Sequence, residues 1–175
     1  MENDVHEKAV TTRGVGIKYG LYSAGFGIFF FLVRALLGLN PYENTWWAVL
    51  ISLAAGVTFI VLAHNEFKRS GDGFMSYGQG VGIGFWMALV GVAIGVLVQW
   101  AYTSFVDPEV MNQFYETQRI QLEDQGVPDS QIDMIQENTR RYFWVFGFLV
   151  AMFISVLLAV IVSIFTQRRN PQPAF

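Results

Sequence analysis

The chain has 175 residues, of which 53% are hydrophobic and only 14% charged, against roughly 25% charged residues in a typical soluble domain. The formal net charge of −3 excludes a strongly basic nucleic-acid-binding protein, because phosphate neutralisation requires clustered lysine and arginine. The absence of cysteine excludes disulfides, thiolate metal sites and cysteine nucleophiles. With a mean hydropathy of +0.39, the composition indicates a one-domain integral membrane protein.

Four apolar stretches are long enough to cross a bilayer, which takes about 20 residues of helix. They are residues 19–39, 46–63, 81–105 and 142–166, and tyrosine and tryptophan gather near their ends as in interfacial aromatic belts. We therefore predict an all-α fold, an integral membrane four-helix bundle. Residues 1–15 form an N-terminal tail, residues 16–105 hold the first three spans, residues 106–141 form a helical segment outside the membrane, and residues 167–175 form a C-terminal tail.

The basic residues near the span ends predict the orientation, because loops on the cytoplasmic side carry an excess of lysine and arginine. Seven basic residues lie on one side of the spans, namely Lys8, Arg13, Lys18, Lys68, Arg69, Arg168 and Arg169. Three lie on the other side among eight acidic residues between Asp107 and Glu137, namely Arg119, Arg140 and Arg141. We expect both termini to be cytoplasmic and the segment of residues 106–141 to be extracytoplasmic.

The first span combines a face of small residues with one deeply placed charge. Gly20, Ala24 and Gly27 share one helical face, a pattern that lets membrane helices approach closely. Arg34 follows on the same face, five residues before Leu39, which is about 7.5 Å along the helix. Because a charge inside the bilayer is costly, we expect Arg34 either to snorkel or be clamped by hydrogen bonds, or to bind an anion or lipid headgroup.

The glycine run at the start of the third span, SYGQGVGIGFW (residues 76–86), lacks the spacing of a phosphate-binding loop. A G-x-G-x-x-G motif would need glycine in place of Ile83 or Phe85. A helix instead places the small residues on one packing face, and these are Gly80, Gly84, Ala88, Gly91 and Gly95. Gln99 continues this face at a depth similar to that of Arg34, so we predict an intramembrane polar pair between Arg34 and Gln99.

The segment between the third and fourth spans is patterned as two amphipathic helices. Pro108 and Pro128 each mark a helix start, and Gly126 separates the two helices. The apolar positions of the two helices are Val110, Phe114, Tyr115, Ile132 and Ile135. We predict a helical hairpin outside the membrane, or extensions of the third and fourth spans, with these residues as a surface that docks a partner.

The sequence offers no catalytic constellation. His6 and His64 are the only histidines, no H-E-x-x-H or G-x-S-x-G motif is present, and no aspartate or glutamate lies within a predicted span. We therefore expect no enzymatic activity, no metal site and no cofactor.

Three segments of the chain resemble a bacterial family of small four-helix membrane proteins, the domain of unknown function 4199. They are HNEFKRSGDGFMSYGQGVGIGF after the second span, DPE after the third span, and the acidic stretch that ends in RR before the fourth. The resemblance covers roughly residues 18 to 167. It implies four spans and a location in a bacterial cytoplasmic membrane, and it carries no catalytic residues.

Two functional hypotheses follow. In the first, the protein is a non-enzymatic structural or interaction component of the bacterial cytoplasmic membrane, embedded in the lipid bilayer, that forms a homodimer or binds an envelope protein through residues 106–141. In the second, it is a small transporter or a lipid- or anion-binding protein that uses Arg34 and Gln99. The second requires Arg34 to face a cavity between helices, and the first requires an exposed apolar face on the hairpin.

Overall fold

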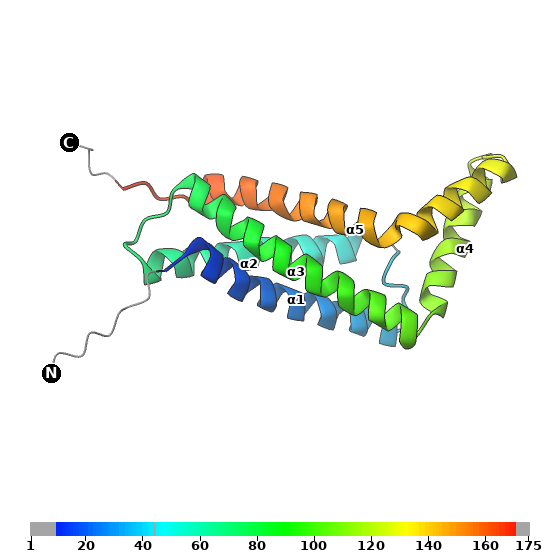
Figure 1. Ribbon diagram of the computed structural model, residues 1–175, viewed down its shortest axis with the longest axis horizontal. Coiled ribbons are helices and arrows are strands. Elements are labelled where there is room, and N and C mark those ends of the chain that lie inside the picture. Colours follow the sequence, from blue (N-terminus) through cyan, green and yellow to red (C-terminus); the bar gives the residue numbers. More distant parts are fainter. Residues whose placement is uncertain (1–9, 44, 171–175) are drawn as a thin grey trace.

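The computed structural model describes residues 10–43 and 45–170 and shows an all-helical chain over these ranges (Figure 1). Its helices are α1 (Thr12–Leu36), α2 (Trp46–Ser70), α3 (Tyr77–Phe105), α4 (Glu109–Asp124) and α5 (Asp129–Thr166). All except α4 are long and apolar enough to cross a membrane. The predicted all-α fold with four apolar spans is confirmed. Lys8 and parts of both predicted tails, residues 1–9 and 171–175, lie outside the described residues.

The four long helices run side by side and alternate in direction (Figure 1). One end of the bundle, here called the terminal end, holds the start of α1, the end of α5 and the connection from α2 to α3. The opposite end, here called the distal end, holds the connection from α1 to α2 and the helix α4, which projects away from the bundle axis. The two ends differ in their packing.

Local capping fixes where the helices begin. Thr11 accepts a hydrogen bond from the Gly14 amide at 3.0 Å and starts α1. Ser76 and Gln79 form a reciprocal capping box that starts α3, so the glycine run of residues 76–86 is a capped helix start and not a loop. The second helix of the predicted hairpin is continuous with the fourth span, because α5 runs unbroken for 38 residues.

Glycines bring α3 close to both of its main neighbours, α1 and α5. A Cβ atom at Gly20 would lie 2.9 Å from the Met87 carbonyl oxygen, and one at Gly80 would lie 2.7 Å from Ser163 Oγ. Similar close contacts would arise at Gly16, Gly84 and Gly91, and Ala24 and Ala88 are buried. At Gly16 and Gly20 the obstacles include backbone atoms of α3, so these two positions leave the least room for a larger side chain, whereas at Gly80 and Gly91 the nearest atom is a serine hydroxyl.

Two glycines of the predicted packing faces do not lie at a close contact. A Cβ atom at Gly27 would have no neighbour within 4 Å, and one at Gly95 would meet only the side chain of Gln99 in its own helix, at 3.8 Å. The prediction of a packing role is wrong for both. Both glycines instead line cavities inside the bundle.

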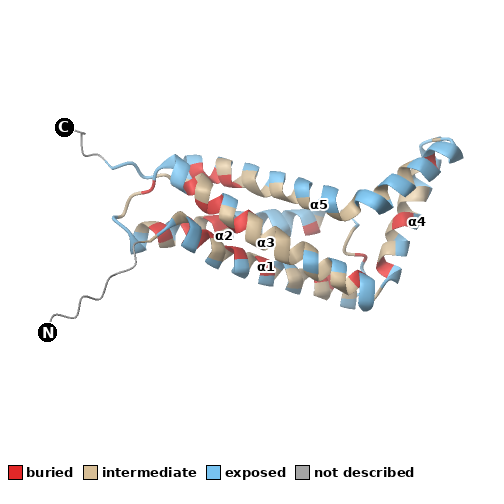
Figure 2. Ribbon diagram, viewed as in Figure 1, coloured by how far each residue is buried: buried red, intermediate tan, exposed pale blue. Residues whose placement is uncertain are grey.

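Burial is concentrated at the two ends of the bundle and is lowest in between (Figure 2). The two apolar core clusters lie in the half nearest the terminal end, around Ile83 and around Ala159. By contrast, none of residues 49–59 of α2, 89–102 of α3 and 133–158 of α5 is fully buried. In addition, α2 has few contacts with α3. The bundle is therefore tight near the terminal end, loosely filled in its middle section and packed again at the distal end.

Candidate functional site

The loosely filled half of the bundle contains three adjoining cavities of about 320, 280 and 440 Å³. All three include Gly56 of α2 in their walls, so we treat them as one space and call it the distal hollow. Its walls come from α1, α2, α3, α5 and the α1–α2 connection, which brings Glu43 and Thr45 to the 440 Å³ cavity. Its small or polar lining residues include Ser23, Gly27, Ser52, Gly56, Gly95, Gln99, Ala151 and Ser155. Apolar side chains such as Phe59 and Leu158 complete the lining. Cavities of this size and composition are typical of ligand sites.

Arg34 stands at the end of the hollow nearest the α1–α2 connection. Its guanidinium donates hydrogen bonds to the backbone carbonyls of Asn40 at 2.8 Å, Glu43 at 2.9 Å and Pro41 at 3.0 Å. It also lies 5.6 Å from the centre of the Trp47 ring, within the range of a cation–π interaction. Arg34 therefore clamps the connection between α1 and α2, which supports the clamp alternative of the sequence prediction.

The clamp leaves Arg34 without a direct ion pair in the described part of the chain, although the carboxylate of Glu43 acts on its charge from more than 4.0 Å away. The side chain is only 7% exposed, and among the described residues no carboxylate oxygen lies within 4.0 Å of the guanidinium. All three acceptors are neutral carbonyls, and the buried Nε has no hydrogen-bond partner. A buried cation with neither a paired anion nor full hydrogen bonding is unfavourable. Two of the three cavities of the hollow include Arg34 in their lining.

Gln99 and Arg34 share the wall of the 320 Å³ cavity, but they do not form the predicted direct pair. In the described part of the chain, no hydrogen bond joins the two side chains, and the Gln99 amide group has no partner of its own. The two terminal nitrogens of Arg34 point instead to the carbonyls of the α1–α2 connection. The sequence could not reveal this, since those carbonyls belong to a loop six to nine residues further along the chain.

A cluster of aromatic rings closes the bundle at the distal end. The ring of Tyr42 packs edge-on against Phe31, Phe114 and Phe143, with ring centres 5.9, 6.1 and 5.4 Å apart. Burial raises the pKa of the Tyr42 hydroxyl well above its ordinary value. Tyr42 lies between Pro41 and Glu43, whose carbonyls accept hydrogen bonds from Arg34, so this cluster supports the clamp from outside.

The apolar face of the hairpin is covered by the chain itself, which contradicts the prediction of a docking surface. Val110 and Tyr115 are 7% and 8% exposed, and Ile132 is fully buried. Phe114 packs on Tyr42 and Phe143, and Ile135 is partly buried. The two helices bury these residues against each other and against the distal end of the bundle, since a bare apolar face in water is unfavourable.

Polar contacts hold the hairpin in this position. Asn40 donates through Nδ2 to the Val110 carbonyl at 3.1 Å, and Gln136 donates through Nε2 to the Tyr115 carbonyl at 2.9 Å. Arg140 lies 4.5 Å from the centre of the Tyr115 ring. Burial raises the pKa of Tyr115, and the charge of Arg140 partly offsets this rise. The hairpin is thus an integral part of the distal end.

The comparison with known proteins identifies the family of the chain. Residues 18–168 match the family described as "Protein of unknown function (DUF4199)", and the chain therefore belongs to that family. No curated protein and no solved structure matches the chain. The resemblance seen in the sequence is confirmed, and the bacterial origin stays a prediction. Function has to be argued from the geometry of the chain itself.

Proposed function

We propose that this member of the DUF4199 family is a non-enzymatic integral membrane protein that binds an anionic amphiphile. The anionic group sits beside Arg34, and the apolar chain occupies the distal hollow. We place the protein in the bacterial cytoplasmic membrane with both termini in the cytoplasm, which follows from the distribution of basic residues. In that orientation the hollow lies at the level of the outer leaflet.

The observation that carries this proposal is the buried charge of Arg34 on the wall of the hollow, which has no carboxylate within 4.0 Å among the described residues. An ionisable residue inside a membrane protein is by default a functional one. The clamp explains where the guanidinium is held, but three carbonyls do not balance its charge. An anion in the hollow would supply the missing counter-charge and an acceptor for the guanidinium. The free amide of Gln99 on the same wall offers further donors.

The remaining lining favours an amphiphile over a fully polar solute. The part of the hollow nearest the terminal end is walled by Ile60, Met87 and Val92 together with glycine and alanine. Only Ser23, Gln99 and Ser155 bring polar side chains to that part, and Ser23 already donates to the Gly20 carbonyl at 2.9 Å. A ligand that is charged at one end and apolar at the other matches this distribution. Movement of the amphiphile across the membrane would be a further step that the proposal does not require.

The test fills the hollow without touching the Arg34 clamp. In Gly27→Leu the new side chain would extend into the hollow, where a Cβ atom meets nothing within 4 Å. The matched control is Gly25→Leu on the same helix, which also has no neighbour within 4 Å but does not line the hollow. The full chain in a non-ionic detergent is mixed with oleoyl lysophosphatidylglycerol or its phosphatidylcholine analogue, and bound lipid is counted by native mass spectrometry.

We expect the wild type and Gly25→Leu to retain the anionic lipid in preference to the zwitterionic one, and Gly27→Leu to lose this preference. Arg34→Gln should weaken binding of the anionic lipid about tenfold or more, because a hydrogen bond to a charged group contributes roughly 1.5–3 kcal/mol. Gln99→Leu should weaken it less. Equal binding to the wild type and to Gly27→Leu would refute the proposal.

The orientation is tested separately. A fluorescent protein that matures only in the cytoplasm, fused after the last residue, should fluoresce, and a cysteine placed at Gln121 of α4 should react with a membrane-impermeant maleimide in intact cells. The reverse pair of results would show that the distal end faces the cytoplasm, and the hollow would then belong to the inner leaflet.

A further inference from the structure

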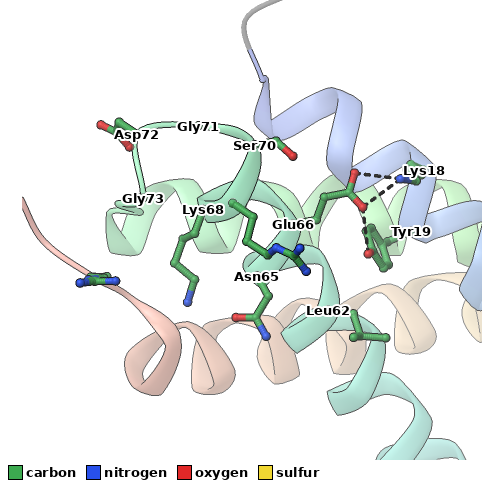
Figure 3. Close-up of a pocket in the computed structure, with 12 residues that line it drawn as sticks. Lys18, Tyr19, Leu62, Asn65, Glu66, Lys68, Ser70, Gly71, Asp72 and Gly73 are labelled. Atoms are coloured by element: carbon green, nitrogen blue, oxygen red, sulfur yellow. Dashed lines mark hydrogen bonds and ion pairs between the residues drawn. The ribbon is translucent and has the colours of Figure 1, made fainter.

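A second pocket, of about 1150 Å³, lies at the terminal end of the bundle (Figure 3). We call it the terminal pocket. Its walls come from α1, the last turns of α2, the α2–α3 connection and the segment that follows α5. The chain brings these segments together through a two-way backbone bridge, in which the amides of Met75 and Arg168 each donate to the carbonyl of the other at 2.9 Å. The pocket is separate from the distal hollow and shares no lining residue with it.

One carboxylate of the pocket is fully engaged. Glu66 accepts hydrogen bonds from Lys18 Nζ at 2.9 Å on both of its oxygens and from the Tyr19 hydroxyl at 3.0 Å (Figure 3). The pair holds α1 and α2 together where the pocket opens. Asp72, the other carboxylate of the lining, accepts a hydrogen bond from the Phe74 amide at 3.0 Å and so shapes the α2–α3 connection. Neither side chain binds the remaining cations of the pocket.

Three cations of the terminal pocket have no carboxylate partner among the described residues: Lys68, Arg69 and Arg168. Lys68 donates through Nζ to the Thr166 carbonyl at 3.0 Å, and the Arg168 guanidinium lies 5.7 Å from the centre of the Phe74 ring. The side chain of Arg69 makes no hydrogen bond in the part of the chain described. Capping of helix ends explains the placement of Lys68, but it leaves Arg69 unexplained.

The pocket also joins a polar rim to an apolar wall. Leu62 of α2 is 45% exposed and lines the pocket one turn before Glu66, on the side of the membrane core. Tyr19 adds an aromatic ring to the same wall. Basic pockets between membrane helices bind anionic lipid headgroups, and each basic residue near the membrane surface contributes about 1 kcal/mol of attraction to anionic lipid.

From these observations we infer that the terminal pocket binds the phosphate group of an anionic lipid. Lys68, Arg69 and Arg168 contact the phosphate oxygens, and Leu62 and Tyr19 contact the apolar part of the lipid. Arginine suits this role because its planar guanidinium binds two phosphate oxygens at once. A soluble phosphate compound would use the same cations but not the apolar wall, so the test has to separate the two sources.

The experiment uses the full chain in nanodiscs of phosphatidylcholine with 20% phosphatidylglycerol, a chosen composition. The lipid retained after transfer to detergent is measured by native mass spectrometry for the wild type and for Lys68→Gln/Arg69→Gln. The control is Arg140→Gln/Arg141→Gln, which removes the same charge at the distal end. Arg69→Gln alone is included because the Arg69 side chain makes no hydrogen bond among the described residues, so we expect this variant to fold as the wild type does. Binding of radiolabelled inorganic phosphate is measured on the same four proteins.

We expect phosphatidylglycerol retention to fall roughly thirtyfold in Lys68→Gln/Arg69→Gln and several-fold in Arg69→Gln, and to be unchanged in the control. If the same two variants lose binding of inorganic phosphate while no protein prefers anionic lipid, the pocket binds phosphate from a soluble compound. Equal retention of lipid and equal binding of phosphate in all four proteins would overturn the inference. Gly27→Leu should not change either readout, which keeps this result independent of the proposed function.

Discussion

The contact between α1 and α3 should not tolerate a single methyl group at Gly16. A Cβ atom there would lie 2.6 Å from Trp86 Cβ and 2.7 Å from the Ile83 carbonyl oxygen. The optimal separation of carbon atoms is about 3.5–4.0 Å, and one of the two obstacles is backbone, so the helices would have to move apart. Over-filling of a packed site typically costs 1–3 kcal/mol. We expect Gly16→Ala to lower the free energy of unfolding by about this amount.

A matched substitution on the facing helix isolates this effect. In Gly82→Ala the nearest atom would be Thr12 Cβ at 3.9 Å, an ordinary contact. Alanine is favoured over glycine in a helix by about 0.8–1.0 kcal/mol, so this variant should be as stable as the wild type or slightly more stable. Unfolding in mixed micelles, followed by tryptophan fluorescence, measures both. If Gly16→Ala proved as stable as Gly82→Ala, the close approach of α1 and α3 would be wrong.

Three further predictions address the buried polar and apolar groups. His64 is fully buried and links three helices through contacts to the Gly80 carbonyl at 3.0 Å and to Thr166 Oγ1 at 2.7 Å. Because His64→Leu leaves these buried partners without the histidine, it should cost roughly 1–3 kcal/mol in the same unfolding assay. A loss of less than about 0.5 kcal/mol would show that these bonds contribute little. Ile132→Ala should lower the free energy of unfolding by about 2–5 kcal/mol, whereas Met134→Ala, at a side chain that is 59% exposed, should lower it little. If the two substitutions had equal effects, Ile132 would not be buried, and the hairpin could again be interpreted as a docking surface. The pKa of Tyr42 is raised in the folded state, so the folded state is favoured below the unfolded tyrosine pKa of about 10, and this stabilisation should be lost as the pH rises above that value. In thermal melts at pH 8 and 11, Tyr42→Phe should therefore lose less stability between the two pH values than the wild type does.

The spans could be predicted from the sequence because hydropathy and length are local properties. The helices α2 and α3 contain the predicted spans of residues 46–63 and 81–105, and their boundaries differ mainly where a cap or a polar turn extends the helix beyond the apolar stretch. The continuity of α5 was one of two alternatives, because Pro128 permits a helix start but does not decide where that helix ends.

The site could be predicted only in part. The depth of Arg34 and its charge were visible, but its partners were not, because they are backbone carbonyls positioned by the fold of a loop. The small-residue faces gave the same signal for Gly20 and for Gly27, although one is pressed against α3 and the other faces an open space. The spacing of residues in the sequence shows that they share a helix face. Whether a neighbouring helix packs against that face depends on the distance between the two helices, which the spacing does not give. The terminal pocket depends on residues 48 positions apart, such as Lys18 and Glu66, and no local pattern links them.

The distal hollow has two physical explanations, and one substitution separates them. Glycine, alanine and serine from all four long helices meet at one depth, for example Gly27, Gly56, Gly95 and Ser155. If the hollow were only a packing defect, a larger side chain would recover lost dispersion contacts and helix propensity with no other consequence. If the hollow is a binding site, a larger side chain should also raise the free energy of unfolding of the ligand-free protein, by up to about 1 kcal/mol from helix propensity alone. The larger side chain should then also prevent the ligand from binding. Gly27→Leu should therefore be more stable than the wild type without lipid and less stabilised by added anionic lipid, because a ligand that binds only the folded state stabilises it by mass action. A variant that gains stability and keeps its response to lipid would show that the space is a defect and that Arg34 serves the loop alone.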